Sequence, residues 1–138
     1  MIYGLLGWAA EVGFTGMRDA VTGRHRTWKL QGNSYLWMLP IYASAAVLFE
    51  PLHHGLRRRP AWQRAVAYAV GITAVEYAAG STLRGAVGLV PWDYSEDSRF
   101  ALPGGAVRLD YLPLWALTGL AMERVSVGLD RVRLLAAT

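Results

Sequence analysis

Residues Ala65–Gly88 read AVAYAVGITAVEYAAGSTLRGAVG, an apolar stretch with one carboxylate, Glu76, near its middle. About 20 residues of apolar helix cross the hydrocarbon core of a bilayer, and this stretch supplies them. An ionisable group at that depth costs at least ~2.5 kcal/mol, so such groups usually face a protein interior or a wet cavity. The stretch therefore predicts either a membrane helix that uses Glu76 or the core helix of a soluble protein.

The composition favours the membrane alternative. Of 138 residues, 54% are hydrophobic and only 17% are charged, whereas a soluble domain usually carries about 25% charged residues. Four apolar segments follow one another along the chain. We therefore predict a single all-α membrane domain over residues 1–138, made of four transmembrane helices arranged as two tandem helical hairpins. The helices are expected at about 2–19, 36–52, 65–88 and 111–129, with a long polar loop between the third and the fourth.

The charges and the absence of cysteine narrow the function. The formal net charge is +4, and Lys29 is the single lysine. Arginine-rich short loops beside apolar runs favour lipid headgroups over nucleic acid as the partner. Without cysteine there is no disulfide, haem thioether or thiolate metal site, and no cofactor is predicted. The densest basic cluster is assigned to the membrane surface and consists of Arg57, Arg58, Arg59 and Arg64.

Two features beside that cluster bear on its surroundings. Glu50 ends the second apolar segment and is expected at the level of the headgroups. His53 and His54 are adjacent, so they point to different sides of a helix. A solvated interfacial pair is therefore favoured over a metal site.

The first apolar segment places Gly4, Gly7 and Glu11 on one helical face. Small residues let another helix approach closely in a membrane, so Glu11 is expected in a seam between helices. We interpret the glycines as packing residues in preference to ligand contacts. The residues assigned to packing or to the interface are Gly4, Gly7, Gly80, Trp37, Pro40, Pro113 and Trp115.

An internal repeat relates the two halves of the chain. LPIYASAAVLFE, starting at Leu39, aligns without gaps to LPLWALTGLAME, starting at Leu112, and the alignment pairs Tyr42 with Trp115. Chance similarity between apolar segments is the alternative. A tandem repeat of hairpins predicts a pseudo-axis along the membrane normal and similar depths for Glu11 and Glu76.

Two carboxylates close together in a low dielectric cannot both ionise cheaply, so the pKa of one should rise. Such a pair would bind a proton, a cation or an amine headgroup, or would perform acid–base chemistry. The alternative is that Glu11 and Glu76 each bond to a neighbouring helix and only fix the packing. The residues alone leave both interpretations open.

Five segments together resemble a known family. They are GWAAEVGFTG, SYLWMLPIY, VEYAAGSTLRG, PWDYS and VRLDYLPLWALTGLAMER. The chain is similar over nearly its whole length to the vertebrate transmembrane protein 229 family and to the bacterial family of putative ABC-transporter type IV permeases. The resemblance implies a small polytopic membrane protein, and its pattern falls on Gly7, Trp8, Glu11, Glu76, Gly80, Trp92, Asp93, Tyr94, Ser95 and Trp115.

The PWDYS motif at Pro91–Ser95 is the most specific part of the resemblance. As structure it predicts a rigid turn at the interface. As function, Asp93 and Tyr94 would orient a polar headgroup above Glu76. The candidate ligand-binding residues are therefore Glu11, Glu76, Trp92, Asp93, Tyr94 and Ser95, and no catalytic residue or metal ligand is assigned.

The sequence supports one function with two alternatives. We predict a small membrane protein that binds or transports a small molecule, a cation or a lipid headgroup through an intramembrane carboxylate pair. The alternatives are an enzyme acting on a lipid or isoprenoid substrate and an accessory subunit of a membrane complex. No P-loop is present, so any use of ATP would need a partner. The expected partners are membrane lipid and a second copy in a homodimer or small oligomer, and the expected location is the bacterial inner membrane with cytoplasmic termini.

Overall fold

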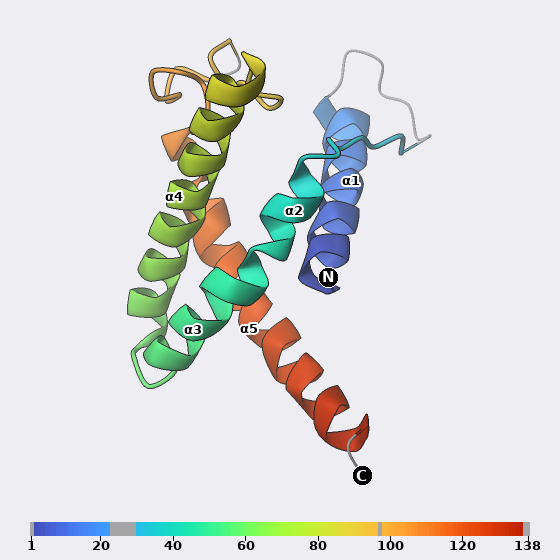
Figure 1. The fold of residues 1–138 in the computed structure, drawn as a ribbon, viewed down its shortest axis with the longest axis vertical. Coiled ribbons are helices and arrows are strands. Elements are labelled where there is room, and N and C mark those ends of the chain that lie inside the picture. Colours follow the sequence, from blue (N-terminus) through green and yellow to red (C-terminus); the bar gives the residue numbers. More distant parts are fainter. Residues whose placement is uncertain (1, 23–29, 97, 137–138) are drawn as a thin grey trace. The chain divides into compact units, whose positions relative to one another are not determined.

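The computed structural model describes residues 2–22, 30–96 and 98–136, with side chains up to residue 131, so Lys29 lies outside the described residues. Its regular structure is helical, and the predicted all-α class is confirmed for these residues. An antiparallel bridge joins Ala101 and Arg108. The helices are α1 (Ile2–Thr22), α2 (Met38–Ala43), α3 (Ala45–Leu56), α4 (Ala61–Val87), the 3-10 helix η1 (Leu109–Tyr111) and α5 (Leu112–Ala136), as Figure 1 shows.

The prediction of four membrane-spanning helices is not supported. Within the described ranges, no helix is both long enough and apolar enough to cross a membrane. The predicted second span is divided into α2 and α3 at Ser44, whose hydroxyl donates to the carbonyl of Ile41 at 2.6 Å. Such bonding to a preceding carbonyl bends helices. α1, α4 and α5 are longer, but each is interrupted by ionisable side chains, among them Glu11, Glu76 and Glu123.

The chain forms two compact units, Met1–Phe49 and Glu50–Thr138. In the first unit α1 packs against α2. Glycine makes this approach possible, because a Cβ atom on Gly4 would lie 3.0 Å from the carbonyl oxygen of Leu39. A Cβ atom on Gly7 would lie 2.6 Å from the ring of Tyr42. The glycine face of α1 therefore faces α2.

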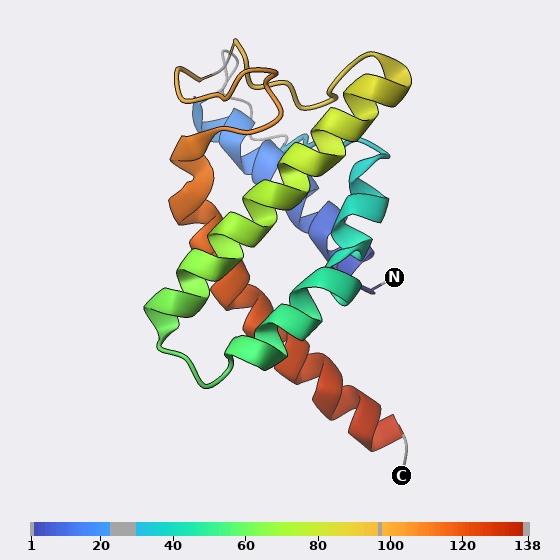
Figure 2. The ribbon, with the colours of Figure 1, turned by 60° about the vertical axis from the view of Figure 1, so that its left-hand side comes forward.

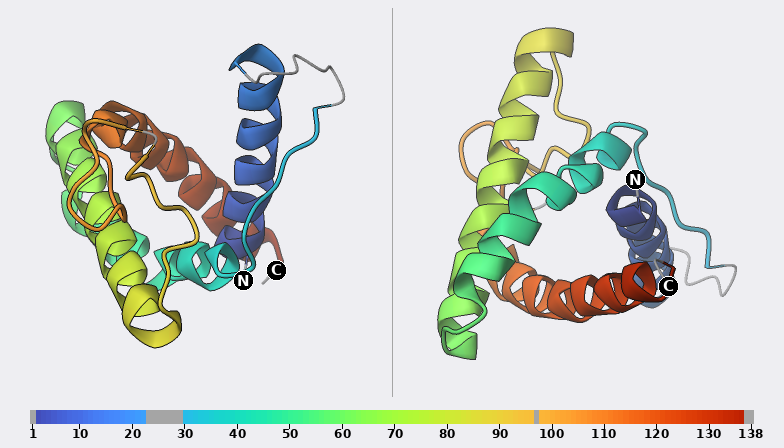
Figure 3. Two further views of the ribbon diagram at one scale, coloured as in Figure 1. Left: turned by 90° about the horizontal axis from the view of Figure 1, so that it is seen from above. Right: turned by 60° about the horizontal axis from the view of Figure 1, so that its bottom comes forward.

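In the second unit α4 packs against α5. α4 is one unbroken helix that runs from the turn after α3 to the loop before α5 (Figure 2). The loop, residues 88–96 and 98–108, lies beside the C-terminal half of α4 (Figure 3). The two helices meet closely where Gly119 of α5 faces Tyr68 of α4, a side chain that is only 1% exposed.

The prolines and Trp37 assigned to packing occupy helix starts. Pro40 is the third residue of α2 and Pro113 is the second residue of α5. The first turn of a helix tolerates proline because its N–H groups have no intrahelical partner. Trp37 precedes α2 at its N-cap position and is 48% exposed.

Candidate carboxylate sites

Glu76 lies midway along α4, half-buried against α5. The indole N–H of Trp115 on α5 donates to Glu76 Oε2 at 2.9 Å. Burial disfavours the charged carboxylate and raises the pKa of Glu76 to about 7, although the Trp115 hydrogen bond acts in the opposite direction. This carboxyl group therefore changes its charge near neutral pH.

A row of aromatic rings continues from Trp115 to the PWDYS motif. The Tyr111 ring meets the Trp115 ring edge-on at 5.7 Å, and the Tyr94 ring meets the Tyr111 ring at the same centroid distance. The guanidinium of Arg108 lies 4.2 Å from the Tyr111 centroid and is held by Asp110. Tyr94 of the motif is thus linked through Tyr111 to Trp115, the hydrogen-bond partner of Glu76. The sequence analysis did not single out Tyr111.

Tyr111 had a signal in the sequence. It lies four residues before Trp115 in VRLDYLPLW, a spacing that places two side chains on the same helical face. The predicted helix began at Tyr111, so this spacing could already have been read from the sequence. In the structure Tyr111 ends η1, which leads directly into α5.

Glu11 occupies a comparable position in the first unit. Its Oε2 atom accepts hydrogen bonds from the Ser34 hydroxyl at 2.6 Å and from the Tyr42 hydroxyl at 3.0 Å. Tyr42 lies on α2, so in each unit the glutamate of the first long helix bonds to an aromatic side chain of the next helix. Tyr42 and Trp115 are the positions that the internal alignment pairs, and their equivalent contacts favour the repeat.

The two glutamates differ in their partners from three carboxylates that pair with arginines. Glu123 pairs with Arg64, Asp93 with Arg84 and Asp110 with Arg108. Glu11 and Glu76 have only neutral donors among the residues that the structure describes. Because they lie in separate units, the proposal that they form one pair stays a prediction.

The PWDYS residues form hydrogen bonds within the loop between α4 and η1. Asp93 Oδ1 accepts the backbone N–H of Ser95 at 2.9 Å, and the Ser95 hydrogen bonds hold the pKa of Asp93 below its ordinary value. The indole N–H of Trp92 donates to the Ala106 carbonyl at 3.1 Å. The backbone N–H of Tyr94 donates to the carbonyl of Gly105 at 2.8 Å. These contacts give the motif the geometry of a bonded turn.

Glycines fit the same loop closely against α4. A Cβ atom on Gly80 would lie 2.5 Å from the Cβ of Ala106. Gly105 has φ +66°, a left-handed conformation that favours glycine. The packing role assigned to Gly80 is therefore to admit the loop, and Trp92 and Gly105 hold that loop in place.

A second polar cluster, which the sequence analysis missed, lies around Glu123. Arg64 forms a two-pronged ion pair with it, Nε to Oε1 at 2.7 Å and Nη2 to Oε2 at 3.2 Å. The Tyr68 hydroxyl donates to Oε1 at 2.8 Å, and His53 Nδ1 lies 3.1 Å from that hydroxyl. The hint in the sequence was the internal alignment, whose two segments end at Glu50 and at Glu123.

The neighbours of this cluster differ from their predicted surroundings. His53 and Glu123 side chains are each 14% exposed, so His53 is not the solvated residue expected beside His54. Glu50 accepts a hydrogen bond from the Ser126 hydroxyl at 2.9 Å, so its partner lies within the protein and not among headgroups.

Within the described ranges, no group of three His, Cys, Asp or Glu residues is arranged to hold a metal ion.

We expect Arg64→Met to lower the melting temperature in detergent more than the double variant Arg64→Met/Glu123→Gln. The single change leaves a largely buried carboxylate without its cation, whereas the double change removes both charges. Arg58→Met, at an exposed position, is the control and should melt like the wild type. Equal melting of Arg64→Met and Arg58→Met would show that the ion pair contributes nothing.

Comparison with known proteins supports the bacterial half of the sequence resemblance. The model of one family, described as putative ABC-transporter type IV, matches residues 1–132. No solved structure matches the chain. The likeness to the vertebrate transmembrane proteins stays a prediction. Since the match covers nearly the whole sequence, the chain belongs to the putative ABC-transporter type IV family.

Proposed function

We propose that this protein works at a membrane and binds a small organic cation, for transport, at Glu76, and that Glu11 is the corresponding carboxylate of the first unit. The observation that carries the proposal is the partner set of Glu76. It is a half-buried carboxylate held by one neutral donor, with no cation beside it among the described residues. A carboxylate in this state is available to bind a cationic ligand or a proton.

The surroundings of Glu76 favour an ammonium group over a metal ion. Aromatic rings attract ammonium groups through their negative faces. Trp115 bonds directly to Glu76, and the Tyr111 and Tyr94 rings follow it in a row. A carboxylate beside aromatic rings fits an alkylammonium ion, which needs one counter-charge and apolar contact. Hard metal ions prefer several oxygen ligands at once.

The first unit supports a similar role for Glu11. Its two donors, Ser34 and Tyr42, are neutral. Three residues earlier on α1, the indole N–H of Trp8 is buried and bonds to none of the described residues. Leaving a buried donor without a partner costs free energy, so this N–H is available to donate to an acceptor on a ligand or to a water molecule.

The family description and the surface support action at a membrane. The family is described by its relation to ABC transporters. Large apolar side chains are exposed along the helices, among them Met17 at 65%, Trp62 at 66% and Leu117 at 67%. Extensive exposed apolar surface marks contact with a partner or with lipid. A homodimer or small oligomer would cover part of it, and native mass spectrometry of the purified protein would read its copy number and bound molecules together.

We expect Glu76→Gln to weaken binding of octylammonium at least about tenfold at pH 8, because the neutral amide keeps the shape but loses the counter-charge. Isothermal titration calorimetry of the full chain in neutral detergent measures the affinity. Binding to the wild type should also weaken at pH 5.5, where Glu76 is protonated.

Octanol and a surface variant provide the controls. Octanol has the same chain length without the charge, so Glu76→Gln should leave its weak binding unchanged. Glu96→Gln removes a carboxylate from an exposed position of the loop and should bind octylammonium like the wild type. Unchanged octylammonium binding by Glu76→Gln would reject the cation site. Glu11→Gln in the same assay tests whether the second glutamate contributes.

A further inference from the structure

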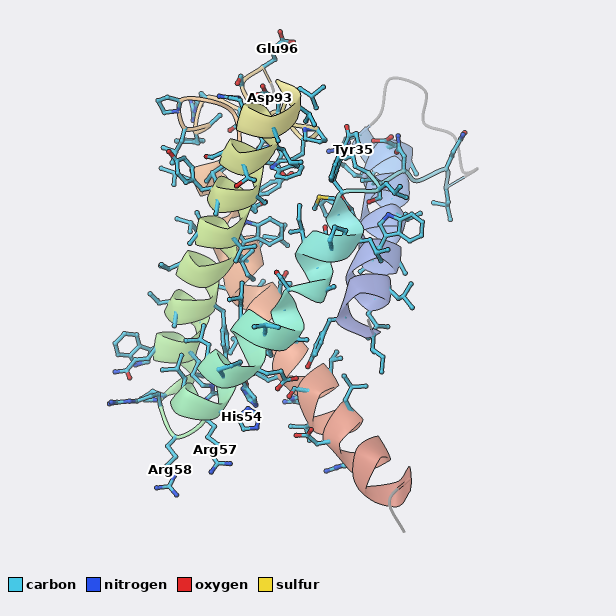
Figure 4. The ribbon with its side chains drawn as sticks, in the orientation of Figure 1. Tyr35, His54, Arg57, Arg58, Asp93 and Glu96 are labelled. Carbon is cyan, nitrogen blue, oxygen red and sulfur yellow. The ribbon has the colours of Figure 1, made fainter. Side chains whose placement is uncertain are left out.

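The turn between α3 and α4 presents an unpaired basic surface. Arg57, Arg58 and Arg59 are all exposed, and within the described part of the chain no carboxylate pairs with them. Arg57 and Arg58 point away from the helices in Figure 4. We call these three residues the arginine turn.

The structure separates the arginine turn from the fourth residue of the basic cluster. Arg64 lies one helical turn into α4, is 21% exposed and uses its guanidinium for Glu123. Its charge is therefore neutralised inside the protein. The three arginines of the turn keep a local charge of +3 that has no partner among the described residues.

An apolar face begins directly beside the arginine turn. Trp62, in the first turn of α4, is 66% exposed, and Val66 and Val70 follow at 56% and 60%. A spacing of four residues places the three side chains on one side of the helix. Tyr68, which is buried, lies on the other side of the helix. The end of α4 thus combines positive charge with an adjoining exposed apolar stripe.

We propose that the arginine turn docks on the phosphate groups of anionic phospholipids, with Trp62 and Val66 against the acyl chains. Charge complementarity and the adjoining stripe select this partner. Guanidinium groups form paired hydrogen bonds with phosphate oxygens, and tryptophan settles at the boundary between headgroups and acyl chains. A nucleic acid would satisfy the arginines but would leave Val66 and Val70 in water.

The inference rests on the proposed action at a membrane, but it uses no residue of the Glu76 site. It is tested on the full chain in neutral detergent micelles that contain equal amounts of phosphatidylcholine and phosphatidylglycerol. Native mass spectrometry counts the molecules of each lipid that stay bound. The wild type should retain phosphatidylglycerol preferentially, and rising salt should reduce that preference.

The triple variant Arg57→Gln/Arg58→Gln/Arg59→Gln should bind phosphatidylglycerol roughly 100-fold more weakly, because each arginine near an anionic surface contributes about a fivefold factor. The matched control, Arg99→Gln/Arg124→Gln/Arg131→Gln, removes the same charge from other exposed positions and should keep the preference. Trp62→Phe should reduce the quenching of protein fluorescence by brominated acyl chains.

Three results would overturn the proposal. The first is that the arginine-turn variant binds phosphatidylglycerol like the wild type. The second is that the matched control loses binding to the same extent. The third is that glycerol phosphate or a short DNA duplex displaces the lipid at comparable concentration, because that would identify a site for soluble phosphate or nucleic acid. Octylammonium binding by the same variants separates this outcome from failure of the Glu76 site, because the arginine-turn variant should retain it.

Discussion

Replacing Gly119 by alanine is expected to destabilise the second unit strongly. A Cβ atom at this position would lie 2.2 Å from the Cβ atom and 2.5 Å from the Cγ atom of Tyr68. Those atoms are close to the α4 backbone, and the Tyr68 hydroxyl is fixed by Glu123. The helices must therefore move apart. Overpacking of this kind costs about 1–3 kcal/mol and sometimes more.

The matched control lies on the same helix. Gly128 is exposed, and a Cβ atom there would meet nothing within 4 Å. Gly128→Ala should raise the free energy of unfolding by about 0.5–1 kcal/mol, because alanine is the better helix former. Denaturant unfolding followed by circular dichroism compares the two variants. A stabilising effect of both alanines would show that α4 and α5 do not meet at Gly119.

The second large effect concerns the pH dependence of stability. The pKa of Glu76 is raised by burial from 4.5 to about 7. Between these values the unfolded chain releases the proton while the folded chain keeps it, so the free energy of unfolding falls as the pH rises. The stabilisation is complete below pH 4.5 and is lost as the pH passes through about 7. It amounts to about 3 kcal/mol.

The difference between the wild type and Glu76→Gln isolates this contribution, since the other titrating groups are common to both proteins. That difference should change by about 3 kcal/mol between pH 4.5 and 8 and stay flat outside this range. Trp115→Phe should shift the window to higher pH, because the indole N–H favours the carboxylate. A difference that does not vary with pH would mean that Glu76 titrates like a free glutamate.

Much of the candidate site could be predicted from local patterns. The helical period of the apolar residues located the long helices, and it placed Glu76 and Glu11 near their centres. The alignment of the two halves paired Tyr42 with Trp115, the two aromatic partners of these glutamates. The helix assignments depend on residues within a few helical turns, where spacing fixes direction, and the alignment depends on the similarity of two short segments.

The sequence by itself determined the helical class and which carboxylates lie inside helices, because both follow from local periodicity and composition. Only the tertiary structure decided which carboxylates are already neutralised. Arg64 and Glu123 are 59 residues apart, and no local pattern distinguishes this arginine from its exposed neighbours. The packing of α4 on α5 brings their charges together, and among the residues that the structure describes it leaves Trp115 as the hydrogen-bond partner of Glu76. Burial and ion pairing depend on contacts between residues that are distant in the sequence. These contacts determine whether the charge of each glutamate is available to a ligand.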